Sequence, residues 1–228
     1  IAQLMDSAKE QVQSLALEIS QKDPKALALL TRALILSGIA MSFSGNSRPA
    51  SGSEHHLSHY WEMLYLAQGK KEILHGIKVG IGLVLSLHLY QFISTYEPDF
   101  DSLSFSQLSV ADDIWEEEMR RCFGKAAPSV ILLERCTRKN GRENWEKRIA
   151  AIQTQWPRIQ SLAASLPSPE EMEALLKKAG CPTHPADIGL DRLSVLDSLL
   201  YAKEVRNRYT VLQLLWDLGI LKSCAESL

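Results

Sequence analysis

Residues 54–94 read EHHLSHYWEMLYLAQGKKEILHGIKVGIGLVLSLHLYQFIS. Residues 54–68 are predicted to form a helix, and residues 69–71, Gly-Lys-Lys, are typical of a turn. From residue 73 to residue 94 the chain is mostly apolar on every side of a helical projection, which is typical of a helix buried inside a protein. The stretch therefore predicts two helices, joined by a tight turn and packed antiparallel.

Helical spacing continues on both sides of this pair, and no convincing period-2 alternation predicts a strand. Asp23-Pro24 and Ser168-Pro169 are predicted helix starts, whereas Gly180 is a predicted stop. Further helices are expected over residues 1–21, 24–43, 111–123, 129–137, 142–165, 192–205 and 210–221, with a bend or break at Pro157. No repeat or long linker divides the chain. These signals predict an all-α fold, a multi-helix bundle forming a single domain over residues 1–228.

The composition is that of an ordinary globular protein, with 46% hydrophobic residues, 23% charged residues and a net charge of −2. A nucleic-acid-binding protein would show an excess of basic residues, so no nucleic-acid partner is expected for this chain. The apolar run over residues 79–93 contains Gln91 and His88 and is too short for a bilayer, which favours a core helix and no membrane contact. The four cysteines form no CxxC pair, and we expect reduced thiols in a cytoplasmic protein.

The first residues, Ile-Ala-Gln-Leu-Met, lack the pattern of a signal peptide and lack an initiator Met at position 1. They are typical of a fragment or of an internal start at Met5. The chain contains neither a glycine-rich strand-to-helix turn nor a GxxxxGK[ST] loop. No nucleotide-binding half is therefore expected within these 228 residues.

Four of the six histidines lie between residues 55 and 75. His55 and His59 are four residues apart and share one face of the predicted helix. His75 begins the next helix and is expected to fold back toward them. His56 points elsewhere and, like His88, is expected to be a satisfied surface group. Imidazole is a common ligand for zinc, nickel and iron, so the cluster indicates either a metal site or an inert surface group of histidines.

Three segments carry a more specific signal. Residues 42–59, SFSGNSRPASGSEHHLSH, resemble the signature of glycerol-1-phosphate dehydrogenases. These enzymes belong to the superfamily of iron-containing alcohol dehydrogenases, glycerol dehydrogenases and dehydroquinate synthases. Residues 74–80, LHGIKVG, and residues 205–212, VRNRYTVL, are similar to two further elements of that superfamily, in the same order. The resemblance implies the helical C-terminal domain of a dehydroquinate synthase-like two-domain fold.

The resemblance also implies a catalytic divalent metal held by one acidic residue and two histidines. Carried over, the histidine ligands are His55 and His75, and His59 is a catalytic group that relays the alcohol proton or contacts substrate. The acidic ligand and the NAD(P)-binding domain are implied to lie upstream of Ile1. The chain alone is therefore expected to bind metal weakly, to bind no NAD(P) and to be inactive, and the whole enzyme is expected to be a homodimer.

A phosphorylated substrate needs cations and amide donors. Arg48 is the preferred candidate, because a guanidinium grips phosphate with two hydrogen bonds. Ser47, Ser51 and Ser53 add hydroxyl groups near a helix N-terminus, which is a natural anion site. The alternative is a turn with a solvated arginine.

Arg206 and Arg208 are further candidates for the phosphate, although capping of the preceding helix is the preferred role for both. Two other functions remain open. The chain is either part of a sister enzyme, such as a glycerol dehydrogenase or a dehydroquinate synthase, or a non-catalytic helical interaction module.

Overall fold

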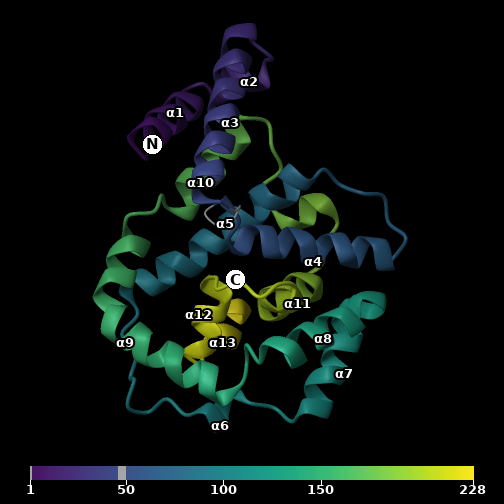
Figure 1. Cartoon of the computed structure of the whole chain (residues 1–228). Coiled ribbons are helices and arrows are strands. Elements are labelled where there is room, and N and C mark those ends of the chain that lie inside the picture. The colour runs from purple at the N-terminus through teal and green to yellow at the C-terminus, as the bar shows by residue number, and fades with distance from the viewer. Residues whose placement is uncertain (1, 46–49) are drawn as a thin grey trace.

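The computed structural model describes residues 2–45 and 50–228, with the backbone alone for residues 2–6 and residue 44. Within these ranges all regular structure is helical, and the described residues form no strand. The prediction of an all-α, multi-helix fold is therefore confirmed. Figure 1 shows the helices gathered around α4 and α5, with α1, α2 and α3 standing to one side.

The described α-helices are α1 (Ala2–Ser14), α2 (Ala16–Ser20), α3 (Pro24–Ser44), α4 (Ser53–Ala67), α5 (His75–Thr95), α6 (Phe105–Leu108), α7 (Asp112–Phe123), α8 (Ala127–Thr137), α9 (Arg142–Ala164), α10 (Pro169–Lys178), α11 (Arg192–Tyr201), α12 (Val211–Asp217) and α13 (Leu221–Ser227). Short 3-10 helices occupy η2 (Gly124–Ala126), η3 (Pro185–Ile188) and η4 (Ala202–Glu204).

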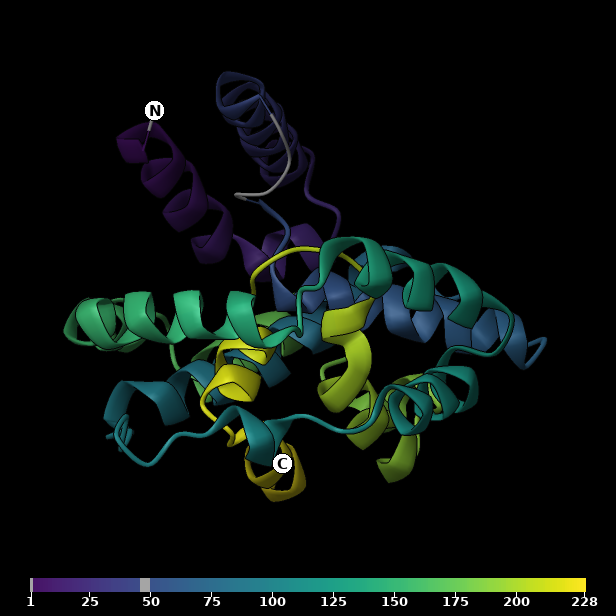
Figure 2. The same cartoon turned by 60° about the horizontal axis from the view of Figure 1, so that its bottom comes forward.

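The core is built around the α4–α5 pair, which is the most extensive helix contact of the described chain. α9 packs along α5, and η4 and α11 pack on α4. Leu57 and Trp61 of α4 and Ile81 of α5 are fully buried in this core. Trp145 and Trp156 of α9 are also buried. The turned view in Figure 2 shows α9 crossing the body of the molecule while α1 and α3 rise above it.

Local capping signals in the sequence are realised in the structure. The Asp23 carboxylate accepts hydrogen bonds from two amides of the first turn of α3, and Pro24 follows it. Ser168 and Glu171 form a reciprocal capping box at the start of α10. Asp191 caps α11 by accepting from the Ser194 amide. Each contact lies within three residues, which is why the sequence alone predicts it.

Several predicted helix bounds were wrong. The helix expected over residues 210–221 is two helices, because Gly219 adopts a positive φ of 74° and ends α12. The helix expected to reach residue 205 ends at Tyr201, where the 3-10 helix η4 begins. The helix expected from residue 73 starts at His75. Conversely, α9 remains one helix through Pro157.

Gly82 permits the close approach of α4 and α5. A Cβ atom at this position would lie 2.8 Å from the backbone carbonyl oxygen of Glu54, which is closer than real Cβ atoms come. One turn on, the buried Ser53 hydroxyl donates to the Ser86 hydroxyl at 2.8 Å. The two helices are therefore packed closely together near the start of α4, where His55 and His59 lie.

Two described helices are long and apolar enough to cross a membrane, Pro24–Phe43 and His75–Thr95. They differ in their surroundings. In the most apolar window of the second, 44% of the residues are buried in the protein, as expected for a core helix, whereas in the first only 6% are. Burial in the protein core thus accounts for the apolar residues of α5. It does not account for those of α3.

Candidate metal and substrate site

The histidine cluster forms where α4 faces the first turn of α5. His55 and His59 lie on α4, and His75 is the first residue of α5. The ring centroid of His75 lies 5.1 Å from that of His55 and 5.4 Å from that of His59. The ring centroids of His55 and His59 are 6.4 Å apart. The structure therefore brings together the three histidines that the sequence singles out.

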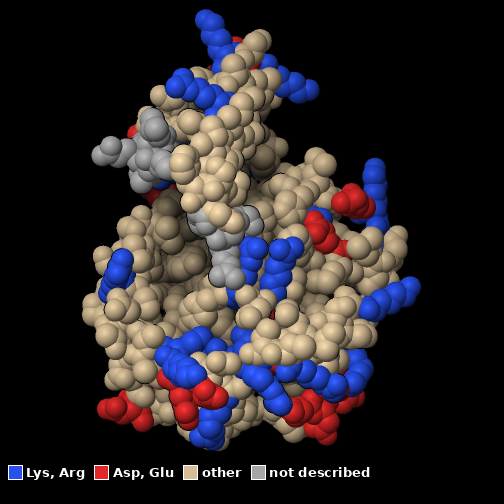
Figure 3. All heavy atoms as spheres, viewed as in Figure 1, with Lys and Arg blue, Asp and Glu red and all other residues tan. Residues whose placement is uncertain are grey.

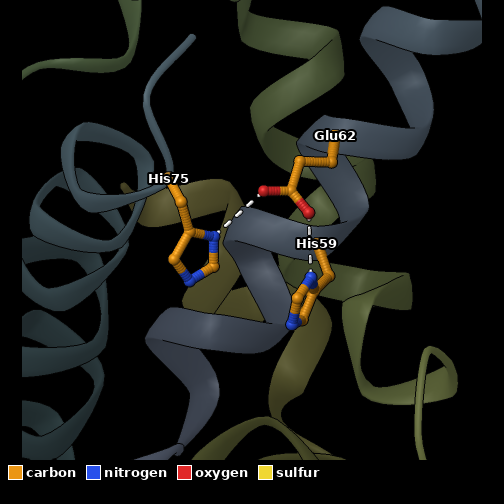
Figure 4. A group of neighbouring side chains, drawn as sticks. All are labelled: His59, Glu62 and His75. Carbon is orange, nitrogen blue, oxygen red and sulfur yellow. Dashed lines mark hydrogen bonds and ion pairs between the residues drawn. The ribbon is translucent and has the colours of Figure 1, made fainter. Parts of the chain in front are cut away.

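Glu62 connects two of these rings. Its Oε2 lies 2.9 Å from Nδ1 of His59, and its Oε1 lies 2.9 Å from Nδ1 of His75 (Figure 4). The buried Lys78 ammonium adds an ion pair to Oε1 at 3.0 Å. The sequence pattern did not single out Glu62, although its position three residues after His59 places it on the same helix face. The chain thus supplies a carboxylate of its own at the cluster.

The hydrogen bonds keep Glu62 ionised. Burial would raise the pKa of this carboxyl, but hydrogen bonds from His75, His59 and Lys78 outweigh it and lower the pKa to about 2. An ionised carboxylate only accepts, so the Nδ1 atoms of His59 and His75 are the donors. In a neutral imidazole the lone pair then lies on Nε2, which at His75 faces Nδ1 of His55 and at His59 faces the Arg206 guanidinium.

His55 completes the cluster on the other side of His75. Its Nδ1 lies 3.2 Å from Nε2 of His75. Burial lowers the pKa of His55, and the neighbouring His75, His59 and Arg206 lower it further against the opposing charge of Glu54. His55 is thereby kept neutral, which is the state that binds metal.

The donor chemistry fits a divalent transition metal. His59, Glu62 and His75 each offer one ligand atom, and these atoms all lie within 4.8 Å of one another. The Nε2 atom of His75 together with Nδ1 of His55 provides a second pair of imidazole donors. Three imidazoles and one carboxylate suit zinc, nickel or iron, and suit magnesium or calcium poorly.

Arg206 reaches the cluster from a distant part of the chain. It follows η4, and its Nη2 lies 3.3 Å from Nε2 of His59, although 147 residues separate the two. Its side chain is exposed. The preferred expectation for Arg206 was a helix-capping role, yet the structure shows a guanidinium beside the histidines. No local sequence signal predicts this contact.

The predicted phosphate-binding residues are placed as follows. Arg48 and Ser47 lie outside the described residues. Ser51 is half-buried just before α4. Ser53 is buried, and its hydroxyl donates to Ser86.

His56 differs from its expected place. It was predicted to be a satisfied surface group, but it is fully buried, and neither of its ring nitrogens has a hydrogen-bond partner. Burial, reinforced by the nearby charges of Lys139, Arg208 and Arg206, lowers its pKa to about 4. The prediction was wrong because η4 packs on this face of α4, and the spacing within α4 does not reveal a covering element.

Comparison with known proteins gives the site its context. No family model matches the chain. A glycerol-1-phosphate dehydrogenase (NAD(P)+) of Geobacillus thermodenitrificans is 34% identical over 196 residues, which is 86% of this chain and 40% of the relative. The enzyme of the same name from Geobacillus stearothermophilus is 33% identical over 202 residues, 88% of this chain and 41% of the relative. That from Halalkalibacterium halodurans is 53% identical over 74 residues, 32% of this chain and 18% of the relative.

The chain spans about two fifths of the length of the first two curated relatives. The match extends over most of this chain, and its all-helical structure fits one domain of a longer protein. The chain is therefore homologous to glycerol-1-phosphate dehydrogenases over about two fifths of their length, an extent that fits a C-terminal domain of such an enzyme.

Proposed function

We propose that the chain is the metal- and substrate-binding domain of an oxidoreductase that interconverts dihydroxyacetone phosphate and sn-glycerol 1-phosphate with NAD(P). The observation that carries the proposal is the cluster of His55, His59, His75 and Glu62 with Arg206 beside it, in a homologue of enzymes named for this activity. Residues 1–228 act in it as a single domain. NAD(P) is bound by an N-terminal domain that the longer relatives provide.

In this proposal His55 and His75 hold the divalent cation. The tautomers support this choice, because Glu62 occupies Nδ1 of His75 and leaves Nε2 facing His55. Nε2 of His59 instead faces the positive Arg206, which disfavours a second cation there. A bound zinc, nickel or iron ion supplies a Lewis acid that stabilises negative charge on the substrate oxygen.

Glu62 is the positioning residue of the site. Carboxylates that accept from the second nitrogen of a ligating histidine fix the ring's tautomer and orientation. Glu62 does this for His75 and His59 together, and Lys78 holds the carboxylate in place. Both rings are therefore set before substrate arrives.

His59 is the group that moves the alcohol proton. Its Nδ1 proton is held by Glu62, so its Nε2 accepts a proton in one direction of the reaction and returns it in the other. Arg206, next to Nε2, offers the exposed guanidinium for the substrate phosphate, together with Arg48, Ser47 and Ser51, whereas the hydroxyl of Ser53 is already used by Ser86.

The proposed setting is a homodimeric cytoplasmic enzyme that makes the glycerol phosphate unit of phospholipids. The state of the thiols supports the compartment, because Cys122, Cys136, Cys181 and Cys224 are all free.

Metal binding by two variants tests the ligand assignment. Metal content and affinity of the 228-residue chain are measured by mass spectrometry of bound metal and by competition with a chelator. His55→Ala is expected to weaken metal binding by the chain, whereas His59→Ala is expected to leave the affinity unchanged. The reverse result would move the cation to the His59–Glu62–His75 set.

Activity is tested in a fusion that joins the part of the Geobacillus thermodenitrificans relative preceding its match to this chain. We expect turnover of dihydroxyacetone phosphate to exceed that of unphosphorylated dihydroxyacetone, and Arg206→Leu to raise KM for the phosphorylated substrate. Equal turnover of both substrates would contradict the proposal and favour a glycerol dehydrogenase. A fusion that binds metal and turns over neither substrate would also contradict it.

A further inference from the structure

α3 is an apolar helix that the described part of the chain leaves largely uncovered. Of its 21 residues only Lys25 and Arg32 are charged among the described side chains. Five of its large apolar side chains are 38–72% exposed, namely Leu27, Leu34, Ile35, Ile39 and Phe43. A helix that is apolar on all sides is normally buried in a protein core or a membrane.

The described chain covers little of this helix. Its extensive contacts are with α1 and α2, and α1 lies along one side only. Figures 1 and 2 show α3 rising away from the body of the molecule. In Figure 3 its surface is mostly uncharged below a few basic side chains at the upper end. We call four of the exposed apolar residues the α3 face, namely Leu34, Ile35, Ile39 and Phe43.

The relatives show that α3 belongs to the dehydrogenase-like region. A match to the enzyme of Bacillus licheniformis spans 204 residues of this 228-residue chain, so it begins no later than residue 25. It therefore includes nearly all of α3. The same relative has most of its length outside the match, since the match covers 38% of it. Polypeptide that could cover the α3 face thus exists in the relatives, outside the region that this chain represents.

We infer that the α3 face is the docking surface for the upstream segment of the dehydrogenase. The inference rests on the proposed function and adds the surface through which the two parts join. α3 ends at Ser44, and α4 begins nine residues later at Ser53, two residues before His55.

Hydrogen exchange measured by mass spectrometry tests the inference. The 228-residue chain is compared with the fusion that carries the upstream part of the Geobacillus thermodenitrificans relative. We expect exchange of the α3 amides to slow at least tenfold in the fusion and that of α8 to stay unchanged. The double variant Leu34→Glu/Ile35→Glu is expected to remove this protection. The control variants Leu132→Glu and Leu162→Glu, at sites 61% and 60% exposed on α8 and α9, are expected to keep it.

Three results would overturn the inference. The first is unchanged α3 exchange in a fusion that unfolds cooperatively by circular dichroism. The second is protection of α3 in the 228-residue chain by self-association, seen in sedimentation. The third is protection by phosphatidylglycerol–phosphatidylcholine vesicles and not by the fused segment. If the fusion does not fold, the upstream segment is added in trans, where absence of a complex sensitive to Leu34→Glu/Ile35→Glu counts against docking.

The same samples separate this inference from the proposed function. A fusion with protected α3 that binds no metal and shows no turnover refutes the function and leaves docking supported. A fusion that binds metal and is active while α3 exchanges freely refutes docking alone.

Discussion

The molecule contains two clusters of ionisable groups with opposite characters. The histidine–glutamate cluster (His55, His59, Glu62 and His75) is partly open, with its Glu62 and His75 side chains 26% and 44% exposed. The lysine–glutamate cluster (Lys139, Lys203 and Glu204) is closed, with side chains 2–8% exposed. The histidine–glutamate cluster is therefore accessible to solvent. In the lysine–glutamate cluster the charged groups pair with one another inside the protein.

In the closed cluster, the charged groups are paired with other side chains of the protein. Glu204 pairs with Lys139 at 2.8 Å and with Lys203, and the Asn140 amide donates to both of its oxygens. The Lys203 ammonium also lies 4.6 Å from the Trp216 ring. The closed cluster therefore stabilises η4, whereas the open cluster is the one that the proposed function assigns to a cation.

The largest expected effect is on the closed cluster. Glu204→Ala leaves two buried ammonium groups without their carboxylate and should cost about 3–5 kcal/mol of unfolding free energy. Urea denaturation followed by circular dichroism measures it. Glu143→Ala removes an exposed pair with Lys147 and serves as the control, with no expected change in midpoint. Equal midpoints for the two variants would show that burial does not distinguish these pairs.

Acid should weaken the same cluster. Burial alone would raise the pKa of Glu204, but Lys203 and Lys139 lower it to about 2, below its ordinary value of 4.5. The stabilisation is therefore present above pH 4.5 and is lost as the pH falls toward 2. We expect Glu204→Gln to show a flatter fall of unfolding free energy over this range than the unmodified chain. Parallel curves would contradict the lowered pKa.

The open cluster depends on the close approach of its two helices. Gly82→Ala forces a Cβ atom against the Glu54 carbonyl oxygen, which should cost about 1–3 kcal/mol and displace His75 relative to His55. Gly76→Ala is the matched control in the same helix, because nothing lies within 4 Å of its added Cβ. Thermal unfolding and metal affinity are measured together. If both variants behave alike, the contact at Gly82 does not set the site.

Glu62→Gln is expected to have the smallest effect on folding, because this change acts mainly on metal binding. We expect metal affinity to fall about 10–100-fold, the range typical of groups that orient a ligating histidine, with little change in unfolding free energy. Equilibrium dialysis measures it, and Glu72→Gln removes an equal charge from an exposed position nearby as the control. Unchanged affinity would remove Glu62 from the site, and a loss beyond about 1000-fold would make it a direct ligand.

The closed and open clusters also mark the limit of prediction from sequence. Helix starts such as Asp23 and Ser168, and the grouping of His55 with His59, depend on contacts within a few residues and were predicted. Glu204 lies 64 residues from Asn140, and no spacing signal connects them.

The candidate site shows the same division. The Arg206–His59 contact depends on the packing of η4 against α4, which periodicity does not specify. Glu62 is the exception, because it is close in sequence to His59 and could have been found by its i+3 position. It was not predicted because the family resemblance places the acidic group of the site upstream of Ile1.

The pairing of His55 with His75 has a consequence for the order of folding. Only 20 residues separate them, so a local helical hairpin brings them together, whereas Arg206 is 147 residues from His59. Contacts of short sequence separation form fast, and N-terminal elements emerge first during synthesis. The imidazoles that would hold the cation can thus meet on the nascent chain before the arginine leaves the ribosome. Under the proposed function, metal loading can precede the arrival of Arg206 at the site.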